Sequence, residues 1–160
     1  MSTGDESALP PPYYFAYGTY LDSTLLADRM PGAEIVTTAR AVNRSLLFLS
    51  AAGGPRRGWC HLADRGEAWG KVAYGLVVST TAIDSDRFGH NEARYLTVYG
   101  DDGATYECWT YCLQRPESAM RLPADEWEHI CAGAAQWRLP DDYRDELVAR
   151  HHAAAECSDR

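Results

Sequence analysis

The hydrophobic pattern of this chain changes its period once, close to Pro116, and this change limits the folds that the chain can adopt. Before Pro116, short apolar runs are separated by turn residues, which is typical of β-strands joined by loops. After it, apolar residues such as Trp127, Ile130 and Ala134 recur at helical spacing. Strands followed by helices predict an α+β fold, and we expect a small mixed β-barrel of about six to seven strands with flanking helices.

Glycine, proline and aspartate punctuate the first part of the chain and separate the expected strands. These strands are 13–17, 34–40, 45–50, 58–63, 69–78, 93–99 and 104–113. We expect helices at 24–29 and 124–137, another that begins near residue 141, and one or two helical turns at 80–87. The pattern predicts a single domain over residues 13–150, with a disordered lead-in at 1–12 and a frayed tail at 151–160.

Charge and composition exclude several classes of function. The chain of 160 residues has a formal net charge of −8 and a pI of about 5.0, so it would repel a nucleic-acid backbone. No segment approaches the roughly 20 apolar residues that cross a bilayer. Residues 1–7 lack the basic start and apolar core of a signal peptide. We therefore expect a cytoplasmic protein with neither a nucleic-acid nor a membrane partner.

The five cysteines follow no disulfide or zinc-binding pattern. The Cys108–Cys112 pair has one of the spacings considered for a metal site, but both residues fall within an expected strand. In a reducing compartment such residues are free thiols that pack as small apolar side chains. We therefore expect no metal and no organic cofactor.

The segment Phe15-Ala16-Tyr17-Gly18-Thr19 ends a short aromatic strand at a glycine. A glycine permits backbone conformations in which successive N–H groups point to one place. A nest of N–H groups of this kind, placed before a helix, suits a carboxylate or a phosphate. The same residues also fit an ordinary tight turn after an edge strand.

This segment resembles the Phe-Ala-Tyr-Gly-Ser loop of the γ-glutamylcyclotransferase-like family, and the resemblance extends in order over residues 13–148. The matching segments are Ala39-Arg40 with Leu46 to Phe48, Glu67 to Val72, Tyr74-Gly75-Leu76, Tyr95, Cys108 to Tyr111, Ile130 to Ala134, Leu139 to Tyr143, and Leu147. The resemblance implies a small α/β barrel. It also implies a reaction in which a γ-glutamyl amide is cleaved by its own α-amine, giving 5-oxoproline and a free amine.

The resemblance also implies the residues of the site. Backbone N–H groups of the loop that includes Tyr17, Gly18, Thr19 and Tyr20 would hold the α-carboxylate of the substrate. Tyr95 and Tyr111 match family tyrosines and would wall the pocket, although both also fit half-buried tyrosines of the barrel. Tyr20 departs from the family, whose members often have asparagine there.

One departure concerns the catalytic base, which in the family is a glutamate just before a glycine. The gapless alignment puts Phe88 at that place, before Gly89, and a phenylalanine accepts no proton. We therefore expect Glu92 to be the base, since a small shift of this loop would bring it to the pocket. The alternatives are Asp84 or Asp86, the imidazole of His90, or no base at all.

Three functions follow from these observations. The first is a γ-glutamylcyclotransferase-type enzyme that acts on a small molecule with a free carboxylate, including the specialised case of a biosynthetic intermediate. The second is an enzyme with different chemistry on the same barrel, because a fold does not fix a reaction. The third is a non-catalytic protein that binds a small carboxylate ligand. The sequence does not specify the oligomeric state.

Overall fold

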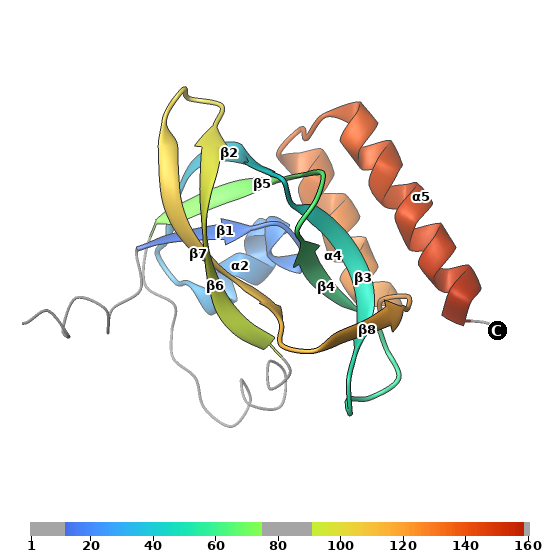
Figure 1. Cartoon of the computed structure of the whole chain (residues 1–160). Helices are drawn as coiled ribbons and strands as arrows, with labels where there is room; N and C mark the ends of the chain where they lie inside the picture. The colour runs from blue at the N-terminus through green and yellow to red at the C-terminus, as the bar shows by residue number, and fades with distance from the viewer. Residues whose placement is uncertain (1–11, 75–90, 159–160) are drawn as a thin grey trace, which may run out of the picture.

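A computed structural model describes residues 12–74 and 91–158 of the chain. The described residues form a barrel, a second small sheet and a group of helices (Figure 1). In chain order the elements are β1 (Tyr13–Ala16), η1 (Thr19–Leu21), α2 (Ser23–Arg29), β2 (Glu34–Val42), β3 (Ser45–Ala51), β4 (Trp59–Ala63), β5 (Glu67–Tyr74), β6 (Asn91–Gly100), β7 (Thr105–Leu113), β8 (Pro116–Ala119), α4 (Ala124–Gln136) and α5 (Asp141–Ser158). The α+β class expected from the sequence is confirmed.

The barrel closes with five strands, in the order β1-β5-β2-β6-β7, rather than with the six to seven expected. Strand β1 closes it by pairing antiparallel with β5 and parallel with β7. The remaining strands form a three-stranded sheet in the order β4-β3-β8. Strand β3 stays outside the barrel because β2, which precedes it, already pairs with β5 on one side and with β6 on the other.

A continuous core joins the barrel to the second sheet and to the helices. Phe15, Val72 and Val98 from the barrel belong to the same buried cluster as Leu46 and Phe48 from β3, together with Ile130 and Leu147 from the helices. Burying apolar side chains of this size contributes about 1.5–3 kcal/mol each relative to leaving them exposed. The core therefore stabilises both sheets as one unit.

Helix α4 packs directly on the segment that follows β1. A Cβ atom added at Gly133 would lie 2.4 Å from both the carbonyl carbon and the Cβ atom of Leu21. Glycine at this position thus lets the helix and η1 approach closely. Helix α5 lies along β3 and β8 of the second sheet (Figure 1). None of the described helices is long and apolar enough to cross a membrane.

The end of the chain differs from the expected frayed tail at 151–160, because α5 continues through Ser158. Ala154 is buried in the core, and the hydroxyl of Ser158 donates to the Ala154 carbonyl oxygen at 2.9 Å. The same hydroxyl accepts from the Arg121 N–H at 2.9 Å. The burial of Ala154 and the bond to Arg121 are tertiary contacts that hold the last turns of α5. The helical turns expected at 80–87 lie outside the described residues.

The buried His61 gives the fold a dependence on pH. Its ring nitrogen Nδ1 accepts a hydrogen bond from the Leu113 N–H at 3.1 Å, and burial, followed by the charge of Arg94, lowers the pKa of the ring. The unfolded chain takes up a proton near pH 6.5, where the folded chain does not. His61 therefore contributes stability above that pH, and this contribution is lost as the pH falls below it towards the lowered pKa of the folded state.

We predict that the free energy of unfolding falls between pH 7.5 and pH 5.5, and that His61→Gln reduces this fall. The measurement is urea denaturation at both values. His152→Gln is the matched control, because its side chain is 75% exposed, and it should keep the full fall. Burial also lowers the pKa of His151. The His61 variant should therefore keep the part of the fall that is due to His151. An identical fall in all three proteins would contradict the assignment to His61.

Candidate functional site

The segment that follows β1 forms a tight, internally bonded turn, which we call the substrate loop (residues 17–21). The Leu21 N–H donates to the Gly18 carbonyl oxygen at 3.0 Å, and the Asp22 N–H donates to the Thr19 carbonyl oxygen at 3.1 Å. Asp22 then caps α2, since its carboxylate accepts from the Thr24 N–H at 2.9 Å.

A cavity of about 70 Å³ lies against the substrate loop. Its described lining residues come from the strand and loop at the start of the chain and from β4, β6 and β7: Tyr14, Tyr17, Gly18, Thr19, Tyr20, Trp59, Cys60, Asn91 and Tyr111. The structure thus brings together five of the site residues expected from the sequence. Trp59, Cys60 and Asn91 were not expected there, because their strands reach the loop only through tertiary packing.

Tyr17 holds the loop to both sheets. Its hydroxyl donates to the Tyr111 carbonyl oxygen at 2.6 Å and lies 3.3 Å from the Cys60 carbonyl oxygen. The side chain is buried, and burial, with smaller effects from neighbouring groups, raises its pKa well above the usual value. The phenol is therefore neutral at physiological pH and fixes the loop position through strand carbonyl groups.

Cys60 forms the wall behind Gly18. A Cβ atom added at Gly18 would lie 3.0 Å from the Cys60 sulfur and 3.2 Å from its Cβ atom. Burial raises the pKa of the Cys60 thiol to about 12. A thiol with this pKa is protonated and poorly nucleophilic at neutral pH. Cys60 therefore shapes the cavity without acting as a nucleophile.

Tyr95 and Glu92, the two site residues expected in β6, are not among the residues that line the cavity. Tyr95 pairs with Trp109, and Ala93 pairs with Tyr111, so Tyr95 shares a sheet face with the pocket tyrosine. Its side chain is 60% exposed and is not among the residues that line the cavity. Tyr95 thus lies on the same face of the sheet as Tyr111, further along β6.

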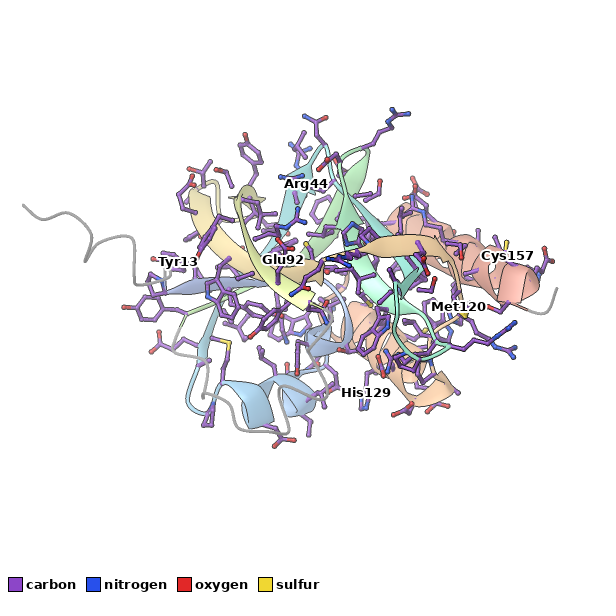
Figure 2. The ribbon with its side chains drawn as sticks, turned by 60° about the horizontal axis from the view of Figure 1, so that its bottom comes forward. Tyr13, Arg44, Glu92, Met120, His129 and Cys157 are labelled. Atoms are coloured by element: carbon purple, nitrogen blue, oxygen red, sulfur yellow. The ribbon has the colours of Figure 1, made fainter. Side chains whose placement is uncertain are left out.

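Glu92 pairs with Cys112, which places both side chains on the face of the hairpin opposite to Tyr111. Its carboxylate accepts from the Arg94 guanidinium at 2.8 Å, and the side chain is 42% exposed. Figure 2 shows Glu92 beside the β6–β7 hairpin. The catalytic role of Glu92 stays a prediction. Phe88 and the alternative bases Asp84, Asp86 and His90 lie outside the described residues.

A larger cavity of about 410 Å³ lies between α4 and α5. Trp127, Ile130 and Val148 contribute to its lining, together with Asp141 and Asp145. None of the expected site residues lies there, and the loop that carries the matched motif is elsewhere. We therefore place the candidate site at the smaller cavity.

The described residues include no group of three or more His, Cys, Asp or Glu side chains that could hold a metal ion. All five cysteines are free thiols.

Comparison with known proteins finds relatives in sequence and in fold. No protein-family model matches the sequence. Human γ-glutamylcyclotransferase is 27% identical over 146 residues, which cover 85% of this chain and 77% of the human protein. A solved structure named γ-glutamyl cyclotransferase superposes with a TM-score of 0.74 at 25% identity and covers 86% of each chain. YkqA from Bacillus subtilis has the same fold, with a TM-score of 0.73 at 18% identity over 94% of this chain and 58% of YkqA.

The contact between Gly18 and Cys60 generates a prediction about stability. We expect Gly18→Ala to lower the free energy of unfolding by about 1–3 kcal/mol, because the new methyl group overpacks the cavity wall. In a Cys60→Ala background the cost of Gly18→Ala should be smaller, since the sulfur at 3.0 Å is gone. Urea denaturation of the four proteins measures this coupling. Equal costs in both backgrounds would show that the two residues are not in contact.

Proposed function

Because this chain is γ-glutamylcyclotransferase-like in sequence and in fold, we propose that it is an enzyme that converts a γ-glutamyl amide into 5-oxoproline and a free amine. The observation that carries the proposal is the convergence of Tyr17, Gly18, Thr19, Tyr20 and Tyr111 on one cavity. Tyr17, Gly18 and Thr19 resemble the family's loop, and Tyr111, 94 positions beyond Tyr17, matches a family tyrosine. Tyr20 lines the same cavity although it departs from the family pattern.

The reaction is an intramolecular acyl transfer. The neutral α-amine of the γ-glutamyl group attacks the carbon of the γ-carbonyl, and a new C–N bond closes a five-membered lactam. The original amide C–N bond then breaks, and the leaving nitrogen takes the proton that the α-amine gave up. Atoms and electrons balance without an oxidant, a reductant or a metal.

The substrate loop supplies what the first step requires. The substrate must fold back on itself, and fixing its α-carboxylate against the loop holds the amine close to the γ-carbonyl. Such orientation can contribute about 7–11 kcal/mol in favourable intramolecular cases. Tyr111 would form the opposite wall of the cavity, and its carbonyl oxygen already holds Tyr17. The loop is thus preorganised by contacts that do not involve the ligand.

We further propose Glu92 as the base that takes the proton from the α-amine. Glu92 follows shortly after Phe88, which occupies the position of the family's usual catalytic glutamate, and this supports the assignment. Its carboxylate forms an ion pair with the Arg94 guanidinium at 2.8 Å. Acting in the pocket would require the start of β6 to turn, because Asn91, the preceding residue, lines the cavity while Glu92 faces away.

A non-catalytic protein that binds a small carboxylate is the second candidate. The observation in its favour is that no Asp or Glu side chain is among the described residues that line the cavity. Turnover separates the two candidates, because a binding protein retains affinity for the ligand and releases no product.

The first test is a panel of γ-glutamyl amides of amino acids and amines, incubated with the purified chain and followed by mass spectrometry. We expect at least one member to yield 5-oxoproline and its free amine in equal amounts. Gly18→Val should abolish this turnover, since a β-branched side chain restricts the loop and meets Cys60. Binding of a panel member without release of 5-oxoproline would instead support the carboxylate-binding protein.

The second test concerns the base. We expect Glu92→Gln to lower kcat by about 10²–10⁴-fold with little change in binding, because the amide keeps the shape and loses the basicity. Glu107→Gln is the matched control: Glu107 belongs to the same hairpin, and its carboxylate accepts from the Thr97 hydroxyl at 2.6 Å. This variant should keep full activity.

Full activity of Glu92→Gln together with an inactive His90→Asn would assign the base to the histidine instead. Phe88→Glu restores the family pattern and separates two further cases. A gain of 5-oxoproline release in this variant would show that the natural protein no longer catalyses the family reaction. A loss would show that Phe88 contributes to the binding of the substrate of this protein.

A further inference from the structure

The only lysine in the sequence is buried beneath the substrate loop. The fifteen basic residues comprise Lys71 and fourteen arginines. Lys71 lies in β5, where its backbone pairs with Ala16 on β1 and with Thr38 on β2, and its side chain has no exposed surface. Burying an ammonium group costs several kcal/mol unless other groups replace its water. A buried lysine thus needs specific partners.

The partners of Lys71 are Leu21 at the end of the substrate loop, Ser23 at the start of α2 and Trp137 at the C-terminal cap of α4. Its ammonium group donates to the Leu21 carbonyl oxygen at 2.8 Å and to the Ser23 hydroxyl at 3.2 Å. It lies 4.7 Å from the centre of the Trp137 ring, within the range of a cation–π interaction. Trp137 also donates through its indole N–H to the same Leu21 oxygen at 3.1 Å.

Leu21 therefore links the Lys71 ammonium group to the cavity. The carbonyl oxygen of Leu21 is held by Lys71, and the N–H of Leu21 closes the turn on the Gly18 carbonyl oxygen at 3.0 Å. Gly18, Thr19 and Tyr20, which line the cavity, immediately precede Leu21 in this turn. A shift of Leu21 would displace all three.

The charged groups around Lys71 are few. Asp22 acts on the ammonium group and opposes the effect of burial, and its carboxylate is itself bonded to His129 of α4 at 2.9 Å. Burial lowers the pKa of Lys71 to about 8. Hydrogen bonds from a charged donor are roughly twice as strong as those between neutral groups. The protonated form thus holds Leu21 more firmly.

We propose that Lys71 is a positioning residue that holds the substrate loop in its ligand-binding conformation through the Leu21 carbonyl oxygen. The proposal rests on the function proposed above only in that the cavity binds the substrate carboxylate. Lys71 does not line the cavity and touches no substrate. Its role differs from simple stabilisation of the fold, because its hydrogen bonds go to Leu21 and Ser23, so that its loss should loosen this segment before it affects distant strands.

The test compares Lys71→Met with Arg40→Met. Arg40 is a cation on the neighbouring strand β2, and its exposed ion pair with Glu67 spans 3.0 Å, so its variant loses the same charge without touching the loop. Hydrogen exchange followed by mass spectrometry, at one fixed pH, reports the order of residues 17–24. We expect this segment to exchange about tenfold faster in Lys71→Met, while segments of β6 and β7 exchange as in the wild type.

Kinetics give a second readout on the most active γ-glutamyl amide of the panel. We expect Lys71→Met to raise KM about tenfold and to change kcat less, because the ligand-binding conformation of the loop is populated less in the free protein and is restored once the substrate is bound. The midpoint of thermal unfolding should fall only modestly, because the Leu21 carbonyl oxygen keeps its hydrogen bond from the Trp137 indole N–H. Lys71→Gln, which keeps a neutral N–H donor, should fall between the wild type and Lys71→Met on both readouts.

The outcomes separate this proposal from the proposed function. Faster loop exchange in Lys71→Met supports the positioning role even where the wild type releases no 5-oxoproline. Unchanged exchange of residues 17–24 in a folded Lys71→Met protein overturns it, and so does an equal change in Arg40→Met. If neither Lys71 variant folds, the residue serves the whole fold, and a role confined to the loop is wrong.

Discussion

The hydroxyl of Tyr17 links the two sheets. It donates to a carbonyl oxygen of β7 in the barrel and lies within 3.3 Å of a carbonyl oxygen of β4 in the second sheet. Because Tyr17 begins the substrate loop, the same contact that joins the sheets also sets where the loop starts. The other end of the loop is held at Leu21 by β5 and α4. The site is thus built between two fixed points, each supplied by a different part of the fold.

The proposed carboxylate site would belong to a chain with a net charge of −8. An acidic surface repels anions over about one Debye length, roughly 8 Å at physiological ionic strength. Backbone N–H groups and a buried ammonium group act at closer range and in a medium of lower dielectric constant, where the interaction is stronger. Local dipoles can therefore outweigh the overall charge of the molecule.

The sequence predicted the class of the fold and most of its strands because their hydrophobic periods are local signals. Strand β8 was missed, since Pro116-Glu117-Ser118-Ala119 has no apolar alternation and pairs with β3 through contacts distant in sequence. The sequence also did not reveal on which face of the sheet Glu92 lies. It depends on the register between β6 and β7, and a shift of one residue would turn Glu92 to the other side. The bond from Tyr17 to Tyr111 spans 94 positions, which no local pattern reveals.

A chain whose single lysine is fully buried has a practical consequence for chemical labelling. Reagents that acylate lysine amines find none on the described surface, so such coupling leaves the folded protein unmodified at lysine. Conversely, a lysine introduced at an exposed position, such as that of Arg40, would be the one accessible side-chain amine there. The molecule could then carry a dye, a surface linker or a crosslinker at one chosen place, with arginine supplying the remaining positive charge and staying inert to the reagent.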